Sequence, residues 1–490
     1  MNYLRLDQPF VLEAGGSLPG ITIAYHTYGR LNADRSNVVW VCHALTANSD
    51  VARWWPGVVG EHGVVRPEDY FIVCANILGS CYGTTGPVGA GPGVGEHGVG
   101  VAGAAAGERI GGDAAGSGGA AAEERIEGDA AGSGGAAVDP CSGGERPLYA
   151  DFPMITIRDM VRAHILLRQH LGIDRIYLLM GGSMGGYQAL EWVVMEPEVI
   201  GRLFLIATSP TESAWGIAVH TAQRLAIEAD SSWREARPTA GQKGLKAARA
   251  IGILTYRNYG IMVQKQTDPD AEKLDGYRAS SYIEYQGKKL VERFSAHSYW
   301  LLTKAMDSHH IARGRGVGAG RVGGEGTGAS RGHFDDKGHA ANAAAVGSEG
   351  RVDGGDHAAV GGNVGSGGHA AVGGNVGSGG HVAIVGSEGR VDGGAHVVVA
   401  GSVGSGGHVA GEGSRRGWNE DVEAVLRGIR QKTLVIGITS DILCPFEEQR
   451  HLAAHLPDAR LIEIDSAYGH DGFMVEGEKI AIHLREWLSE

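Results

Sequence analysis

Basic residues are scarce in this chain of 490 residues. It carries 43 lysines and arginines against 56 aspartates and glutamates, which gives a formal net charge of −13 at pH 7. The sequence therefore has neither the basic face that binds nucleic acid nor a polybasic stripe for an anionic membrane. We expect no nucleic-acid partner and no membrane partner.

Long apolar runs and cysteines are also scarce. No stretch approaches the roughly 18 apolar residues of a membrane-spanning helix. The first residues, MNYLRLDQPFVLEAGG, lack the basic start and apolar segment of a secretory signal. The few cysteines are odd in number, scattered and without zinc-finger spacing, which favours reduced thiols in a cytoplasmic protein. They are Cys42, Cys74, Cys81, Cys141 and Cys444.

Glycine, by contrast, is abundant and unevenly placed. Of the 82 glycines, 52 fall in two tracts, residues 88–145 and 317–417. Removing these 58 and 101 residues leaves 331, a suitable size for one large α/β domain with a cap. The tracts also supply −9 of the formal charge, so the remainder is only mildly acidic.

Both tracts contain tandem repeats. The first repeats ERIGGDAAGSGGAAA at Glu108 as ERIEGDAAGSGGAA at Glu124, and the second repeats HAAVGGNVGSGG at His357 and His369. Glycine and small residues bury too little apolar surface to offset the entropy of ordering, so we predict two disordered insertions. A glycine-rich solenoid is the alternative. Metal binding by the periodic histidines is disfavoured because spaced imidazoles in a flexible chain are poor ligands. We favour recent tandem duplication without function.

The rest of the chain alternates between short apolar runs and helical patterns. The runs are almost continuously apolar, which is typical of parallel strands covered on both faces. They lie at residues 37–42, 70–75, 175–180, 202–207, 433–438 and 460–464. Helical spacing follows at 156–171 and 188–199. This alternation predicts a mainly parallel sheet with helices on both sides, and residues 10–28 are predicted to form an antiparallel hairpin at its edge.

The domain boundaries follow from these patterns. Residues 1–87, 146–210 and 418–490 are expected to form the α/β core. Residues 211–316 are mostly helical in pattern and lie between two sheet strands, so we predict a helical cap over one end of the sheet.

The strongest motif is Gly181-x-Ser183-x-Gly185, which follows an apolar strand directly and opens a helical pattern. This context predicts a nucleophile elbow, in which a serine projects from a tight turn at the sheet end. The flanking glycines are needed because bulkier residues would clash in such a turn. The helix start favours developing negative charge beside the serine.

A serine nucleophile needs a base that an acid holds in place. In this arrangement the acid and then the histidine follow the serine along the chain. Asp441 comes just after the strand KTLVIGITS, and His470 lies in SAYGHDGF after the strand RLIEIDS. Both are therefore predicted at the same sheet end as Ser183, where they complete a catalytic triad.

Other candidates are less well placed. Asp465 precedes His470 too closely to lie opposite it, and the side chain of Asp471 should point elsewhere. His451 and His455 lie on the helical pattern EEQRHLAAHL and are interpreted as surface groups.

An oxyanion hole requires two backbone N–H donors, one after the nucleophile and one after an early strand. Met184 supplies the first, and Leu45 is our choice for the second, with Thr46 as the alternative donor. His43 is interpreted as a structural histidine that braces this loop. These residues predict acyl-serine chemistry but leave open whether water or another nucleophile accepts the acyl group.

Several blocks together resemble the homoserine O-acetyltransferase family. They are GGSMGGYQALEW, HALTANSD, NILGSCYGTTGP, DFPMITIRDMVRAHILL, SYWLLTKAMDSHHIARGRG, TLVIGITSDILCPFEEQ and YGHDGF, in the family's order. The resemblance spans nearly all of the 331 residues outside the glycine tracts. It implies an α/β-hydrolase fold, an acetyl-CoA co-substrate, L-homoserine as acceptor, methionine biosynthesis and a homodimer.

By the same resemblance, Ser183 would be acylated, His470 would act as base and acid, and Asp441 would orient it. Arg224 would bind the homoserine carboxylate and Asp471 its ammonium group. The alternatives are an exposed helical arginine and an aspartate that bonds to its own loop. No metal and no tightly bound cofactor is implied.

Three other functions remain open. The family includes succinyl users and members that act on serine, so a homoserine or serine O-succinyltransferase is one alternative. A serine esterase on the same scaffold is another, although it would not need the charged pair Arg224 and Asp471. A catalytically idle scaffold that associates through the glycine tracts is the third.

Overall fold

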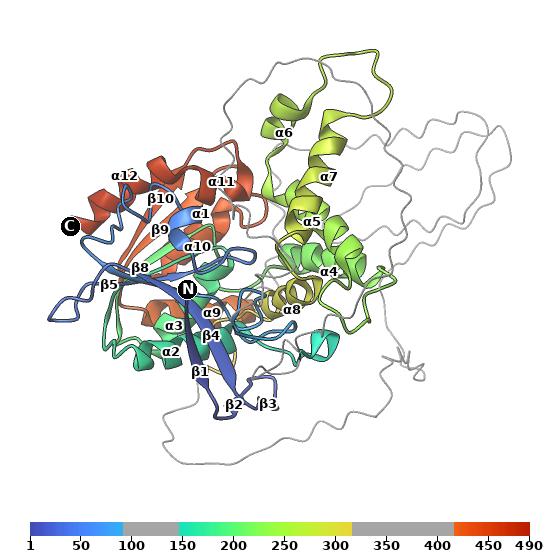
Figure 1. Ribbon diagram of the computed structural model, residues 1–490. Coiled ribbons are helices and arrows are strands. Elements are labelled where there is room, and N and C mark those ends of the chain that lie inside the picture. Colours follow the sequence, from blue (N-terminus) through green and yellow to red (C-terminus); the bar gives the residue numbers. More distant parts are fainter. Residues whose placement is uncertain (92–146, 316–415) are drawn as a thin grey trace, which may run out of the picture. The chain divides into compact units, whose positions relative to one another are not determined.

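A computed structural model describes residues 1–91, 147–315 and 416–490 (Figure 1). The two predicted insertions, 88–145 and 317–417, lie almost wholly outside these residues. The disorder predicted for them therefore concerns residues outside the described ranges.

An eight-stranded sheet forms the centre of the protein, in the order β1-β4-β6-β5-β7-β8-β9-β10. The strands from β6 to β10 are parallel, whereas β4 is antiparallel to both β1 and β6. Their bounds are β1 Asn2–Leu6, β4 Ile21–Tyr28, β5 Val38–Cys42, β6 Phe71–Ala75, β7 Ile176–Gly182, β8 Ile200–Ile206, β9 Lys432–Ile438 and β10 Ala459–Ile464. The predicted mainly parallel sheet is confirmed, and each of the six predicted apolar runs forms a strand.

The apolar runs are continuous because both faces of the sheet are covered. Every residue of β5 is buried, and its side chains alternate between two separate cores. Val38, Trp40 and Cys42 pack in one core, whereas Val39 and Val41 pack in the other. Because both sides of such a strand are buried, its sequence does not alternate between apolar and polar residues.

Helices cover each face (Figure 1). The first core includes side chains of α2, α3, α9 and α10, whereas the second includes those of α1, α11 and α12. These helices are α1 Val51–Trp54, α2 Ile157–His170, α3 Met184–Met195, α9 Arg416–Gly428, α10 Phe446–His455, α11 Gly472–Val475 and α12 Gly477–Leu488. Helix α2 begins where a capping box closes its first turn, with Thr156 and Asp159 bonded reciprocally.

The N-terminal edge differs from the prediction. Residues 10–28 do not form the edge hairpin themselves. Instead β1 pairs with β4, while β2 (Phe10–Val11) and β3 (Ser17–Leu18) form a separate two-stranded sheet. Gly15 and Gly16 form the tip of that small hairpin, where both have positive φ.

Five helices occupy the segment predicted as the cap. They are α4 Ala214–Glu228, α5 Gln242–Tyr256, α6 Tyr259–Gln266, α7 Arg278–Val291 and α8 Ala296–Asp307. Helix α4 packs on α5 and α8, and α5 packs on α7. Within the described ranges, no helix is long and apolar enough to cross a membrane.

Candidate active site

Ser183 stands at the turn between β7 and α3. Its backbone has φ 54° and ψ −128°, a region that side chains rarely occupy and that stores strain at functional sites. The neighbouring glycines allow this turn. A Cβ on Gly181 would lie 2.1 Å from the Gly185 carbonyl oxygen, and a Cβ on Gly185 would lie 2.1 Å from the Cys42 carbonyl oxygen. The predicted elbow therefore has its expected geometry.

The structure brings Ser183, His470 and Asp441 into one hydrogen-bonded chain. Nε2 of His470 lies 2.8 Å from the Ser183 Oγ, and Nδ1 lies 2.6 Å from Asp441 Oδ2. All three side chains are buried. Asp441 and His470 come from the loops after β9 and β10, so the parallel sheet places them at one edge with Ser183. The competing Asp465 faces Thr439 instead.

The surroundings of His470 set its proton affinity. Burial by itself disfavours the imidazolium, but the charge and hydrogen bond of Asp441, with smaller contributions from Asp471 and Glu212, outweigh it. The pKa of His470 is therefore raised above its ordinary value. The other oxygen of Asp441 accepts N–H bonds from Leu443 at 2.8 Å and Cys444 at 2.9 Å. These bonds fix the carboxylate while it orients the imidazole.

The predicted oxyanion donors lie beside the serine. Leu45 lines the same pocket as Ser183, and Met184 is the first residue of α3. Within the described ranges, neither amide N–H donates a hydrogen bond to another protein group. His43 lies behind this loop, where its Nδ1 contacts the Ala44 carbonyl at 2.8 Å and its Nε2 accepts from the Ile77 amide at 3.2 Å. It therefore braces the loop from a buried position.

The two residues assigned to the amino-acid substrate lie apart. Asp471 lines the pocket and pairs with Arg257 at 3.0 Å. Arg224 is buried on α4, where it pairs with Asp307 at 2.5 Å, and it is not among the pocket-lining residues. His220, one helical turn earlier on α4, does line the pocket. Arg224 thus lies one helical turn away from a residue of the pocket wall.

Four cationic side chains that the sequence analysis did not single out also line the pocket: Arg249, Arg257, Lys289 and Arg293. Arg293 binds the Thr46 carbonyl at 2.6 Å and the Tyr82 hydroxyl at 2.8 Å, and so holds the loop that carries Leu45. Lys289 and Arg293 are four residues apart, but Arg293 lies just beyond the end of α7 at Val291, so helical spacing alone would not have paired them. The pocket is thus strongly basic although the chain is acidic.

Asp441, Cys444 and His470 also have ligand atoms within 4.8 Å of one another. A metal there would have to displace the hydrogen bond between His470 and Asp441. Burial also raises the pKa of the Cys444 thiol well above its ordinary value, which disfavours the thiolate that binds metals. Asp441 and His470 therefore fit a proton relay with Ser183 better than a metal site with Cys444.

A mainly parallel sheet in this order, with a strained serine between a strand and a helix, defines an enzyme of the α/β-hydrolase fold. The family model described as "alpha/beta hydrolase fold" matches residues 37–242. A homoserine O-acetyltransferase of Cyclobacterium marinum is 32% identical over 98% of this chain and 92% of its own length. The chain therefore belongs to the homoserine O-acetyltransferase family.

Solved structures share the fold. A homoserine O-acetyltransferase from Bacillus anthracis superposes with a TM-score of 0.62 at 18% identity, covering 100% of this chain and 97% of that one. Esterase E22 superposes with a TM-score of 0.61 at 15% identity, covering 99% of each chain. At these identities the likeness shows the fold alone, and transferases and esterases share it.

Proposed function

We propose that this enzyme moves an acetyl group from acetyl-CoA to the hydroxyl of L-homoserine, in methionine biosynthesis, through an acyl-serine intermediate. The observation that carries the proposal is the unbroken chain from the Ser183 Oγ through His470 to Asp441, which opens on a basic pocket. Membership of the family supports the same reaction.

In the first half-reaction, the Ser183 Oγ attacks the thioester carbonyl while Nε2 of His470 takes the serine proton. Asp441 orients His470 and stabilises the imidazolium. The developing oxyanion accepts N–H bonds from Leu45 and Met184. The C–S bond then breaks, and His470 returns its proton to the departing CoA sulfur. This leaves acetyl-Ser183 and free CoA.

In the second half-reaction, the homoserine hydroxyl gives its proton to Nε2 of His470 and attacks the acetyl-serine carbonyl. The bond to the Ser183 Oγ breaks, and His470 returns the proton to that oxygen. The products are O-acetylhomoserine and the free enzyme, so donor and acceptor use the same site in turn. No metal or bound cofactor takes part in this scheme.

The pocket's charges suit both substrates. Asp471 is a carboxylate that can bind the ammonium group of homoserine beside its existing partner Arg257. The buried Nη1 of Arg224 has no hydrogen-bond partner among the described residues, so we assign this atom to the substrate carboxylate. Reaching it requires the acceptor to enter past His220. Arg249 and Lys289 supply positive charge for the phosphates of the CoA donor.

Release of the CoA thiol from acetyl-CoA, with and without homoserine, tests the reaction. Without homoserine the wild type should release at most one CoA per active site; sustained CoA release should require homoserine, and Ser183→Ala should release none. Ser308→Ala is a matched control because, among the described residues, the Ser308 hydroxyl bonds only to the nearby Ala305 carbonyl. Release equally fast without homoserine would indicate an esterase, and turnover only with succinyl-CoA would indicate a succinyltransferase.

The acceptor site has its own test. Asp471→Asn should raise the KM for homoserine at least about tenfold, since a charge-assisted hydrogen bond is worth about 1.5–3 kcal/mol. The first half-reaction, measured as a burst of CoA without acceptor, should change little. An equal loss in both half-reactions would remove Asp471 from the acceptor site and assign it to the triad's support.

We also propose a homodimer that forms through the cap. Large apolar side chains are exposed on its helices, namely Trp215, Leu225, Leu254 and Tyr259. These side chains come from α4, α5 and α6, and a gathering of exposed apolar groups is typical of an association surface. Sedimentation analysis of the wild type and of Leu254→Asp would show a dimer that the variant weakens.

A further inference from the structure

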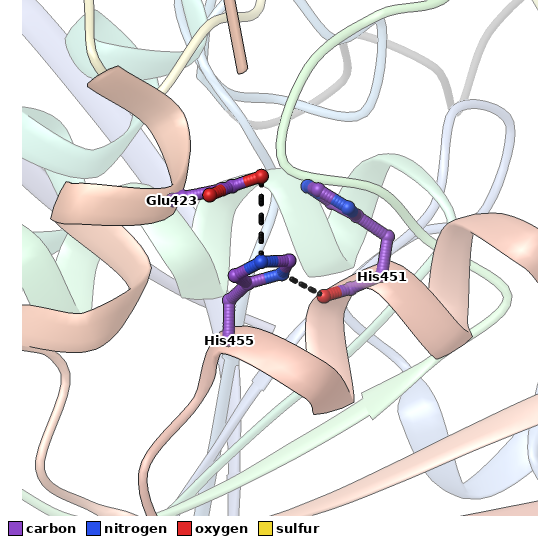
Figure 2. Close-up of side chains that lie close together, drawn as sticks. All are labelled: Glu423, His451 and His455. Atoms are coloured by element: carbon purple, nitrogen blue, oxygen red, sulfur yellow. Dashed lines mark hydrogen bonds and ion pairs between the residues drawn. The ribbon is translucent and has the colours of Figure 1, made fainter. Parts of the chain in front are cut away.

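A cluster of potential metal ligands lies outside the active site. Glu423 projects from α9, and His451 and His455 project from α10 (Figure 2). One ligand atom from each side chain lies within 4.8 Å of the others, and all three residues are half-buried. The proposed acyltransfer makes no use of them, and the sequence analysis interpreted both histidines as surface groups.

The backbone preorganises the two histidines. They are four residues apart on one helix, so both rings lie on the same face, the spacing at which paired histidines chelate zinc in helical motifs. Their ring centroids are 4.5 Å apart. Nδ1 of His455 lies 2.9 Å from the His451 carbonyl oxygen. A carbonyl only accepts, so Nδ1 carries the proton and Nε2 of the neutral ring is left with a lone pair.

That lone pair faces a carboxylate. Nε2 of His455 is 3.3 Å from Glu423 Oε1 (Figure 2). Two acceptors at this distance need a cation between them, either a proton or a metal ion. Two ligand atoms at about 2.1 Å from a tetrahedral ion are about 3.4 Å apart, close to the observed spacing.

The remaining groups complete a ligand set. Arg427 binds the other oxygen of Glu423 at 2.7 Å, which orients Oε1 toward His455. The ring nitrogens of His451 make no hydrogen bond within the described ranges, so one of them is available as the third ligand. The bond from His455 Nδ1 to a backbone carbonyl is the outer contact that usually fixes a metal-binding histidine.

We propose that Glu423, His451 and His455 bind one divalent transition-metal ion, of which Zn²⁺ is the best match. Two imidazoles and one carboxylate suit zinc, copper or nickel better than calcium or magnesium. Partial exposure leaves room for water as a fourth ligand. The ion links α9, the first described element after residue 415, to α10, which directly follows the loop that carries Asp441. It is a structural link and takes no part in acyl transfer.

Zinc titration of the full chain by calorimetry tests the proposal, with Co²⁺ absorption as a second readout. The wild type should bind one more Zn²⁺ per chain than His455→Ala, and Glu423→Gln should weaken that site at least about tenfold. Histidines of residues 317–417 contribute equally to every variant, so only the difference counts. His62→Ala, which removes an exposed histidine elsewhere, should bind like the wild type.

The experiment distinguishes a bound metal ion from a proton-bridged ion pair. Co²⁺ should give the visible bands of a tetrahedral site in the wild type and lose them in His455→Ala. Equal stoichiometry and affinity in the wild type, His455→Ala and Glu423→Gln would overturn the proposal and leave a proton-bridged ion pair. If His455→Ala unfolds, as circular dichroism would show, Glu423→Gln decides alone because it keeps the side chain's shape.

Discussion

Replacing Asp441 by asparagine should stop the proton relay by reversing the hydrogen bond to His470. Oδ1 of Asp441 accepts from two backbone amides, those of Leu443 and Cys444. In Asp441→Asn, only the amide oxygen can take that place, so the NH2 group must face Nδ1 of His470. The imidazole then carries its proton on Nε2, where it cannot accept the proton of Ser183.

The size of the rate loss depends on the free energy needed to turn the asparagine amide into its other orientation. Flipping the asparagine would restore the reactive tautomer but would set its NH2 group against two buried N–H donors. Each unsatisfied buried group costs about 1–3 kcal/mol, so the flip costs about 2–6 kcal/mol. A rate loss of about 10⁴, equivalent to about 5.5 kcal/mol, is therefore expected in kcat, as in serine enzymes that carry the same change.

CoA release under saturating substrates measures this loss. Asp465→Asn is the matched control because Asp465 is exposed and bonds to Thr439 rather than to the triad, and it should retain activity within about twofold. A loss of less than tenfold in a folded Asp441→Asn enzyme would refute the reasoning. It would show that the carboxylate does not set the tautomer of His470.

Three further predictions concern the same edge of the sheet. Ser183→Gly should be inactive but about 1 kcal/mol more stable to thermal unfolding than Ser183→Ala, since glycine adopts the positive φ at this position without strain. Equal stability of the two variants would show that the turn is unstrained. Gly185→Ala should lower the free energy of unfolding by about 3 kcal/mol or more, since its Cβ would lie 2.1 Å from the Cys42 carbonyl oxygen. A soluble variant with the melting temperature of the wild type would contradict this. The base must be neutral to accept a proton, so kcat/KM should fall as pH falls through the pKa of His470, which lies above the ordinary histidine value. Asp441→Asn should move this fall in kcat/KM to lower pH, because it removes the largest favourable influence on the imidazolium. If the fall does not move, a group other than His470 causes it.

The sequence was sufficient for the parts of this protein in which local pattern and chain order determine position. Continuous apolar runs identified the parallel strands because a doubly covered strand has no polar face. The order of the strands then placed Asp441 and His470 at the same edge as Ser183, since parallel strands carry their following loops to one end of the sheet. The glycines around Ser183 were also interpretable from the local sequence, because the turn is too tight for a Cβ at those positions.

Tertiary structure decided what depends on contacts between distant segments. The hairpin expected within residues 10–28 was wrong in its pairing, because β4 gains more by pairing with β1 and β6 than with its neighbours in the chain. The pairing of Arg224 with Asp307 brings together helices more than 80 residues apart in sequence, and no local pattern encodes it. The basic pocket and the approach of Glu423 to His455 arise in the same way. Side-chain charges are visible in the sequence, but their distances are set only when the helices pack.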